Sequence, residues 1–422
     1  MKGTMAGQIL ARRCGREVTP GEAVRVPVDV VCLTDGTPLG FLADGVHRVW
    51  DPTRVIMTFD HLDRVRMPAL HQGKRAFLDA QGIPPENFFG IGRHGISHQI
   101  PAEHGWALPG AVFAGGDTQA ATMGAMNALA LATNESTHNT LATGDVWLIV
   151  PECVSVRLEG ELAPGFVAKD VTEHLQQVLA GVAEGTIVEF GGPAVEHLSI
   201  DTRLGIANVA NNIGALSMLF PPDRVLLDHV RDRAKYAYEP VHPRPDAGYA
   251  AEVVVDLGEV RRQVRGPDDG APPRPVEELD GLEVTAAYVG SCSSARIADL
   301  ELVARIVRGR TVHPGVRFVV TPISSLVAAE AARRGYLETM LTAGVTVTTP
   351  GCGACFAGNQ SPLLLEPGDR CVTTSVENNR GRMGSPEADI YITDPAVVAA
   401  SALAGRVTDP EPYLEDRAHA VA

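Results

Sequence analysis

The stretch 283–321 constrains the fold of this chain more than any other part. Residues 283–290 are mostly apolar or β-branched and predict a strand, residues 297–308 have the apolar spacing of an amphipathic helix, and residues 316–321 predict a second strand. A strand, a helix and a strand in this order form a parallel α/β unit with a right-handed crossover. Ligands bind at the carboxyl ends of such strands, where the turn Gly290-Ser291-Cys292 lies.

Three further segments carry structural signals. Residues 21–31 alternate and then become continuously apolar, and residues 54–59 are almost wholly apolar, so each predicts a strand that enters a core. Small residues dominate between about 110 and 144, as in 115–117 and 120–130, which predicts a tight polar turn that leads into a closely packed, alanine-rich helix. We therefore expect an α/β protein throughout.

The length of 422 residues exceeds what one hydrophobic core usually supports, so two or three domains that meet at a cleft are expected. Residues 263–280 are rich in proline and polar side chains and form the clearest linker. We place a domain boundary there.

The net charge of −15 repels a phosphate backbone, so nucleic-acid binding is not expected. The sequence contains no stretch of eighteen or more apolar residues, so no membrane span is expected. The N-terminus lacks the apolar core of a secretion signal, and residues 8–13 predict the start of a helix instead. We expect a cytoplasmic protein whose seven cysteines, an odd number, stay reduced.

A Cys-x-x-Cys motif lies at Cys352 and Cys355, in a loop flanked by glycine and proline. The spacing alone fits half of a zinc site, a thiol redox pair or two ligands of an iron–sulfur cluster. A zinc ribbon needs a second such pair, whereas Cys292 and Cys371 stand singly. A thioredoxin-like pair opens a helix early in a small domain, whereas this motif comes late in a long chain. These alternatives lose weight but stay open.

Several segments resemble motifs of the aconitase and 3-isopropylmalate dehydratase large-subunit family. The turn Gly-Ser-Cys-Ser-Ser-Ala-Arg around Cys292 is similar to that family's Gly-Ser-Cys-Thr-Asn-Ser-Arg loop, and Cys352 follows 60 positions later, as in its large subunits. Further matches keep the family's order over nearly the whole chain. They are Thr58-Phe59-Asp60-His61, residues 95–103 with a Gly-Ile-x-His core, 116–118 with 141–144, 167–170, and 381–384 through 405–407.

The resemblance implies an α/β fold of three aconitase-type domains around a cluster-binding cleft, without the swivelling fourth domain. On this basis residues 1–185 form the first domain, 186–280 the second, which ends in the linker, and 281–422 the third. The third domain carries the cysteines of both motifs.

The resemblance also implies that Cys292, Cys352 and Cys355 hold three corners of a [4Fe–4S] cluster and leave the fourth iron open to substrate. An iron with an open position is a Lewis acid that makes hydroxide a feasible leaving group. The four remaining cysteines are expected to be buried structural side chains.

The same motifs assign catalytic roles to two histidines and two aspartates. His61 is the candidate acid that protonates the departing hydroxyl, and Asp60 orients it. His98 and Asp117 form a second polar face of the site. Outside the family context, a satisfied structural histidine and a turn-capping aspartate are the commoner roles of these residue types.

Some pocket positions depart from the family pattern. Gln119 stands where the family has a histidine, Asn212 where it has an acidic residue, and Glu377 where an arginine helps to clamp a substrate carboxylate. A glutamate repels that carboxylate. Either Arg380 reaches in from a shifted register, or the substrate lacks the carboxylate, carries a cation there or differs in shape. The candidate substrate-binding residues are Ser291, Ser293, Arg296, Gln119, Asn212, Arg380 and Arg382.

The predicted function is that of the large subunit of an iron–sulfur hydro-lyase or isomerase, acting on a small hydroxy acid related to isopropylmalate or aconitate but divergent from them. In the family, a serine in a Gly-Ser-Ser-Arg-Glu-like motif on the swivelling domain removes the carbon-bound proton. This sequence lacks that motif, so a small subunit is the expected partner in a heterodimer. The alternatives are a degenerate homologue with a binding or structural role, and a zinc-binding variant.

Overall fold

The computed structural model describes residues 1–37, 48–61, 67–268, 270–356 and 361–415. The chain folds into two compact units. Unit 1 comprises Met1–Ile91, Ser97–Glu161 and Val178–Gly258, and unit 2 comprises Gly92–Ile96, Leu162–Gln177 and Glu259–Ala422.

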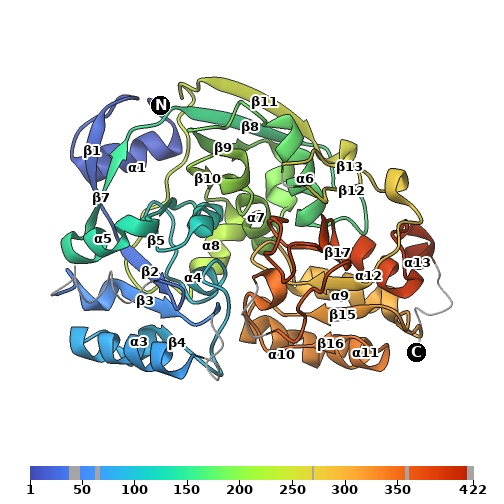
Figure 1. Cartoon of the computed structure of the whole chain (residues 1–422). Helices are drawn as coiled ribbons and strands as arrows, with labels where there is room; N and C mark the ends of the chain where they lie inside the picture. The colour runs from blue at the N-terminus through green and yellow to red at the C-terminus, as the bar shows by residue number, and fades with distance from the viewer. Residues whose placement is uncertain (38–47, 62–66, 269, 357–360, 416–422) are drawn as a thin grey trace. The chain divides into compact units, whose positions relative to one another are not determined.

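A five-stranded parallel sheet is the first layer of unit 1 (Figure 1). Its strands, in spatial order, are β4 (Phe88–Phe89), β3 (Val55–Thr58), β2 (Val30–Thr34), β5 (Val112–Gly115) and β6 (Leu129–Ala132). Every residue of β2, β3 and β5 is buried. Continuous burial is typical of a parallel sheet that is covered on both faces, and it explains the uninterrupted apolar runs in the sequence.

A second parallel sheet and a two-stranded ribbon complete the strands of unit 1. The sheet has the spatial order β10 (Ser217–Leu219), β9 (Ile187–Gly191), β8 (Cys153–Glu159) and β11 (Ala251–Asp256). The ribbon pairs β1 (Ala23–Pro27) with β7 (Asp145–Ile149) in antiparallel register. Residues of β1 alternate between exposed and buried, as expected for a ribbon with one face on the core.

Helices cover these sheets and form the connections between their strands. The longest are α1 (Met5–Cys14) and α3 (Pro68–Gln81). The others are η1 (Pro52–Arg54), η2 (Pro85–Asn87), α4 (Ile100–Glu103), η3 (Thr118–Met126), η4 (Asn134–Ser136), α5 (Thr137–Thr143), η5 (Pro193–His197), α7 (Ile200–Ala207), η6 (Ala210–Ile213), α8 (Arg224–Val230) and η7 (Leu257–Glu259).

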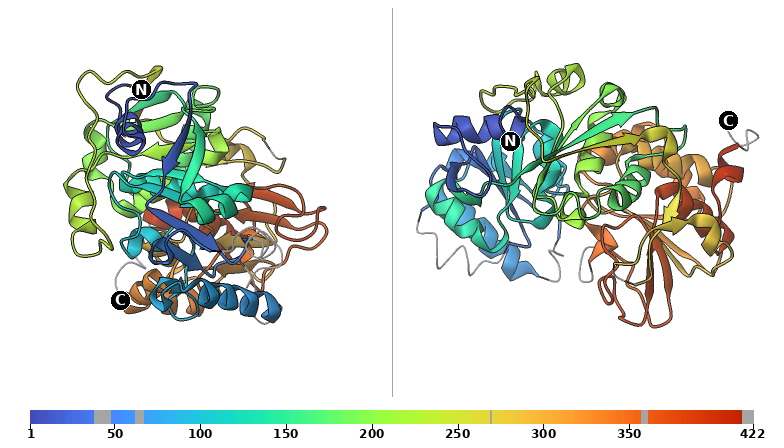
Figure 2. Two further views of the ribbon diagram at one scale, coloured as in Figure 1. Left: turned by 90° about the vertical axis from the view of Figure 1, so that its left-hand side faces the viewer. Right: turned by 90° about the horizontal axis from the view of Figure 1, so that it is seen from above.

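Unit 2 is built on one five-stranded parallel sheet. Its spatial order is β16 (Thr346–Val347), β15 (Arg317–Val320), β14 (Ala286–Val289), β17 (Arg370–Thr373) and β18 (Asp389–Ile392). Helices α9 (Ile297–Val307) and α12 (Pro395–Ala404) pack against each other, and α12 packs against β14 (Figure 1). Figure 2 shows the same chain from two further sides. The remaining elements are α6 (Ala168–Val178), β12 (Gln263–Val264), β13 (Arg274–Pro275), η8 (Val276–Leu279), α10 (Ser325–Arg333), α11 (Tyr336–Thr342), η9 (Gly353–Cys355) and α13 (Glu411–Glu415).

The α/β fold class predicted from the sequence is confirmed, since parallel sheets alternate with helices in both units. Two local predictions need correction. The run 21–31 is divided between β1 and β2, which belong to different sheets, and the small-residue run after Asp117 forms the 3₁₀ helix η3 followed by strand β6. The three-domain division stays a prediction. No helix in the described ranges is long and apolar enough to cross a membrane.

Candidate active site

Polar residues follow three neighbouring strands of the five-stranded sheet in unit 1. Asp35 comes after β2, Asp60 after β3 and Asp117 after β5. Carboxyl ends of parallel strands meet at one edge of the sheet, so these carboxylates are gathered by the topology alone. We call Asp35, Asp60, His61, His98 and Asp117 the acid–base cluster.

His61 is held by the first two carboxylates of this cluster. Its Nδ1 lies 2.8 Å from Oδ1 of Asp60 and 3.7 Å from Oδ1 of Asp35. The Asp35 carboxylate also accepts the backbone N–H groups of Asp60 and His61, at 3.2 and 2.9 Å. Asp60 uses its second oxygen to accept the backbone N–H of Ser97 at 2.7 Å. The imidazole orientation is therefore fixed by two buried carboxylates.

Asp117 links the two histidines of the cluster. Its Oδ1 lies 3.1 Å from Nε2 of His98, and its Oδ2 lies 3.5 Å from Nε2 of His61. Burial alone would raise the pKa of Asp117, but His98 and then His61 lower it well below its usual range. Asp117 also caps η3 by accepting the backbone N–H of Gln119 at 3.1 Å. The turn-capping role and the role in the cluster thus hold together.

Gln119 presents an amide without a partner. Its side chain is buried, and neither Nε2 nor Oε1 has a hydrogen-bond partner among the residues that the structure describes. A buried amide left in this state is costly, unless a ligand satisfies it. This favours the substrate-binding role predicted for Gln119.

Lys74 is a charged residue of this region that the sequence reasoning missed. It lies on α3 and is fully buried, and its Nζ has no hydrogen-bond partner within the described ranges. Burial lowers the pKa of Lys74 to about 8, against the opposing attraction of the Asp35 carboxylate. A lone lysine on an amphipathic helix gives no sequence signal of burial.

The three cysteines predicted to hold an iron–sulfur cluster lie after strands of the unit 2 sheet. Cys292 follows β14, while Cys352 and Cys355 follow β16, where Cys352 directly precedes η9 and Cys355 is its last residue. Each is less than 9% exposed, and none forms a disulfide. All five strands of this sheet are parallel, so both loops emerge at the same edge.

The turn that carries Cys292 has an unusual backbone. Ser291 and Ala295 adopt φ values of 76° and 60°, which L-residues rarely do. The turn is held from inside, because Arg296 donates from Nη2 to the carbonyl of Cys292 at 3.1 Å and Ser293 donates its hydroxyl to the carbonyl of Thr374. Strain retained at such a turn is typical of a functional loop.

Tyr288 supports the loop that carries Cys352 and Cys355. Its hydroxyl donates to the carbonyl of Cys352 at 2.8 Å. Burial chiefly raises the pKa of Tyr288, and Cys355 and Cys352 contribute to the rise. Gly353 has a φ of 56°, and a Cβ there would lie 2.3 Å from the Tyr288 hydroxyl. Only glycine therefore fits at position 353.

Arg382 connects the cysteines to the segment 375–382, which follows β17. Its Nη2 lies 3.9 Å from Sγ of Cys355, and its Nη1 lies 2.7 Å from Oε2 of Glu377. Burial alone would lower the pKa of Arg382, but Cys355, Glu377 and more weakly Cys292 raise it. Its Nε is buried without a hydrogen-bond partner in the described part of the chain.

Arg380 and Asn212 are two further predicted substrate-binding residues. Arg380 pairs with Asp268 at 3.1 Å and with Asp389 at 3.7 Å, and half of its side chain is exposed. It is Arg382, and not Arg380, that lies beside a cysteine. Asn212 lies in η6 and is half-buried.

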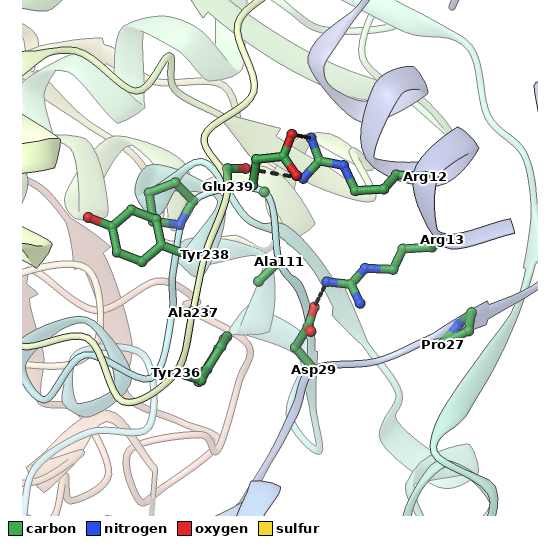
Figure 3. A pocket seen from close by; sticks show the side chains of 11 residues that line it. Arg12, Arg13, Pro27, Asp29, Ala111, Tyr236, Ala237, Tyr238 and Glu239 are labelled. Atoms are coloured by element: carbon green, nitrogen blue, oxygen red, sulfur yellow. Dashed lines mark hydrogen bonds and ion pairs between the residues drawn. The ribbon is translucent and has the colours of Figure 1, made fainter. Parts of the chain in front are cut away.

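A hollow of about 550 Å³ in unit 1 contains none of the predicted site residues (Figure 3). Its two arginines are already paired, Arg12 with Glu239 at 3.1 Å and Arg13 with Asp29. Tyr236 and Tyr238 contribute to its wall. The balanced charges give this hollow no preference for an anion or a cation.

Comparison with known proteins identifies the family of this chain. The model of the aconitase family (aconitate hydratase) matches residues 46–278 and 273–405. The chain is 37% identical to 3-isopropylmalate dehydratase large subunit 1 of Methanopyrus kandleri, with 97% of this chain and 99% of that protein covered. It is 38% identical to the probable methanogen homoaconitase large subunit of Methanosarcina mazei, with 91% and 98% covered.

Among solved structures, the crystal structure of aconitase X (holo-form) from Thermococcus kodakaraensis is similar, with a TM-score of 0.50. The identity is 14%, and the match covers 86% of this chain and 88% of that one. This likeness concerns the fold alone. The family match and the full-length relatives establish that the chain belongs to the aconitase family of hydro-lyases.

Proposed function

We propose that this chain is the large subunit of a hydro-lyase that uses a [4Fe–4S] cluster, held by Cys292, Cys352 and Cys355, to dehydrate a small hydroxy carboxylic acid. The observation that carries the proposal is the set of three buried cysteines on loops at one edge of the unit 2 sheet, bordered by Arg382 and Tyr288. The printed names of the relatives, which are large subunits of 3-isopropylmalate dehydratase and homoaconitase, support it.

The residues present fit such a cluster. Cysteine thiolates are the usual protein ligands of the irons in an iron–sulfur cluster. Three of them for four irons leave one iron without a protein ligand. Arg382 supplies positive charge beside Cys355, which offsets the negative charge of thiolates. When bound, the cluster supplies a Lewis-acidic iron that weakens the bond between carbon and hydroxyl in the substrate.

The acid–base cluster supplies the proton in this proposal. Asp60 accepts a hydrogen bond from the Nδ1–H of His61, so that Nε2 of the protonated imidazole is the nitrogen that donates a proton to the departing hydroxyl. Asp117 stays ionised because of its two histidine neighbours, and its negative charge favours a protonated His61. The unsatisfied amide of Gln119 binds a polar group of the substrate, and His98, beside Asp117, forms the second polar face of the site.

A partner must supply the base that removes the carbon-bound proton. Within the family this group is a serine in a Gly-Ser-Ser-Arg-Glu-like motif, and the 422 residues of this chain contain no such motif. The relatives are named as large subunits, which implies a smaller one. We propose a small subunit that carries the swivelling domain.

The substrate is proposed to differ from isopropylmalate and citrate at one carboxylate. Glu377 occupies the position of a clamping arginine and neutralises Arg382 through a contact of 2.7 Å. A substrate carboxylate at this place would meet a balanced ion pair and gain little. A substrate that has a hydroxyl, an amide or a cation at this end fits better.

The decisive measurement is iron and acid-labile sulfide content, with visible absorbance, on protein purified without oxygen. Wild type is expected to contain cluster-level iron and sulfide, and Cys292→Ser and Cys352→Ser to lose most of both. Cys371→Ser is the matched control, because Cys371 is fully buried in the same sheet but lies within β17. Zinc in place of iron, or no metal in any variant, would refute the cluster.

Turnover is then measured with the small subunit present. Isopropylmalate, citrate, homocitrate and methylcitrate form the substrate panel. Slow turnover of all four, together with an intact cluster, is the result expected for a divergent substrate. Efficient turnover of isopropylmalate would refute the proposal that the substrate differs from isopropylmalate, but it would not contradict the proposed cluster chemistry.

A further inference from the structure

Unit 2 contains a buried triad of charges, Lys169, Glu173 and Arg265. Lys169 and Glu173 lie one turn apart on α6, with 2.9 Å between Nζ and Oε1. Arg265 donates from Nε to the second oxygen of Glu173 at 3.0 Å. The three side chains are 3%, 2% and 9% exposed. Burial alone would raise the pKa of Glu173, but Lys169 and Arg265 lower it, so the carboxylate stays ionised.

The triad consists of two cations and one carboxylate. Besides Glu173, both cations contact the backbone of the segment 375–382. Lys169 donates from Nζ to the carbonyl of Ser375 at 3.2 Å, and Arg265 donates from Nη2 to the carbonyl of Val376 at 3.3 Å. These two carbonyls are consecutive and directly precede Glu377. The anchors come from positions 206 and 111 residues away in the chain.

Stability alone does not explain this arrangement. Buried ion pairs are often no more stabilising than apolar side chains of the same volume, because each charge must leave water. Hydrogen bonds from such a network to the backbone, like those to Ser375 and Val376, specify one backbone conformation. The conformation specified here is that of the segment that places Arg382 beside Cys355 and Glu377 beside Arg382.

A neighbouring network provides the contrast. Arg262 is as buried as Arg265 and pairs with Asp394 at 2.9 Å and Asp170 at 3.6 Å. Its other polar partners in the described ranges are the carbonyl of Gly165 and the carboxylate of Glu411. None of these lies in the segment 375–382. Arg265 therefore contacts the segment, whereas the comparably buried Arg262 does not.

We propose that Lys169 and Arg265, held together by Glu173, are positioning residues that fix the backbone at Ser375 and Val376 and thereby the placement of Glu377 and Arg382 in the substrate pocket. The functional part of this inference rests on the proposed function, because it gives Arg382 a role in binding. The structural part, which is the anchoring of the segment, does not. Residues that support a binding group in this way change its precision more than its presence.

The experiment compares amide hydrogen exchange of the full chain by mass spectrometry in wild type and four variants. Arg265→Lys keeps the charge opposite Glu173 but loses the reach to Val376, and Arg262→Lys makes the same change in the network that does not touch the segment. Lys169→Met removes one cation and leaves a balanced Glu173–Arg265 pair, and Lys169→Arg is the conservative variant. Slow exchange at Arg382 and Gly384 is expected in wild type, since their N–H groups bond to Asn379 and Gly381.

The expected result is exchange at least tenfold faster across 375–384 in Arg265→Lys and Lys169→Met, partial rescue in Lys169→Arg, and a change below twofold in Arg262→Lys. Unchanged exchange in Arg265→Lys and Lys169→Met, or an equal rise in Arg262→Lys, overturns the anchoring. With an active substrate from the panel, KM should rise in the two anchor variants while kcat changes less. If no substrate is found and no cluster forms, the proposed function fails while the exchange result still decides the anchoring.

Discussion

Glu377 and Arg382 form an ion pair, with 2.7 Å between Oε2 and Nη1, in the segment that borders Cys355. The sequence indicates that a glutamate here repels a substrate carboxylate, but the structure adds that this glutamate also occupies the arginine that would attract one. Both effects act against the same chemical group. The proposed divergence of the substrate therefore rests on this pair.

Glu377→Gln is expected to release Arg382 for substrate binding. A charge-assisted hydrogen bond contributes about 1.5–3 kcal/mol, so kcat/KM for the panel acid that carries a carboxylate at this end should rise roughly 10- to 100-fold. The native substrate should lose efficiency in the same variant. Glu387→Gln, which changes an exposed glutamate nearby, is the control. An unchanged order of preference across the panel would show that the pair does not contact substrate.

Gly353→Ala is expected to prevent cluster binding. A Cβ at this position would lie 2.3 Å from the Tyr288 hydroxyl and 2.4 Å from Oγ1 of Thr321, so the loop between Cys352 and Cys355 cannot keep its shape. Gly335→Ala is a matched control, because Gly335 also has a positive φ, 74°, but nothing lies within 4 Å of its added Cβ. The control should cost about 1 kcal/mol and keep its iron. Iron and sulfide content per chain, measured in both variants, tests this difference.

The sequence predicted the parts of the molecule that local patterns determine. The strand–helix–strand run appears as β14, α9 and β15, and the turn after β14 carries Cys292 as expected. The same reasoning overextended the helix in the small-residue run. Residues such as Leu129 and Ala130 pair with β5 in the sheet, and this tertiary pairing overrides the helical preference of alanine.

The burial of charged residues in helices could not be predicted from the sequence. Lys169, Glu173 and Lys74 have the spacing of solvated side chains, yet each is nearly or fully buried. Their burial is decided by contacts with residues far away in the chain, such as Ser375 and Arg265. No periodicity records such contacts. The segment 167–170 matches a family motif, but the motif does not indicate which residues Lys169 contacts.

Asp60→Asn is expected to lower kcat about 10²- to 10⁴-fold while the cluster content stays the same. The amide no longer fixes the Nδ1 proton of His61, whose nitrogen lies 2.8 Å from the present carboxylate. His61→Gln should give a loss of the same order, and the double variant should lose little more, because the two residues act as one unit. His138→Gln lies outside the acid–base cluster and should keep full activity. Additive losses in the double variant would argue that Asp60 has a separate role.

Lys74 gives a prediction about stability and pH. The folded state lowers the pKa of Lys74 from 10.5 to about 8, so the charged amine is penalised by folding. Below pH 8 both states bind the proton and the penalty is complete. Between about pH 8 and 10.5 only the unfolded state keeps the proton, so the free energy of unfolding increases as the pH rises. Above that range both states are neutral and the penalty is gone.

Lys74→Met should therefore stabilise the protein at pH 7 by about 1–3 kcal/mol, since one pKa unit corresponds to about 1.4 kcal/mol. Its advantage over wild type should shrink as pH rises from 8 to 10.5. Thermal unfolding of both proteins at pH 7, 8, 9 and 10 measures this, and Lys235→Met, at an exposed lysine of the same unit, controls for the loss of charge. A lower Tm for Lys74→Met at pH 7 would mean that the ammonium is stabilised in the folded state, so that its attraction to Asp35 exceeds the cost of its burial.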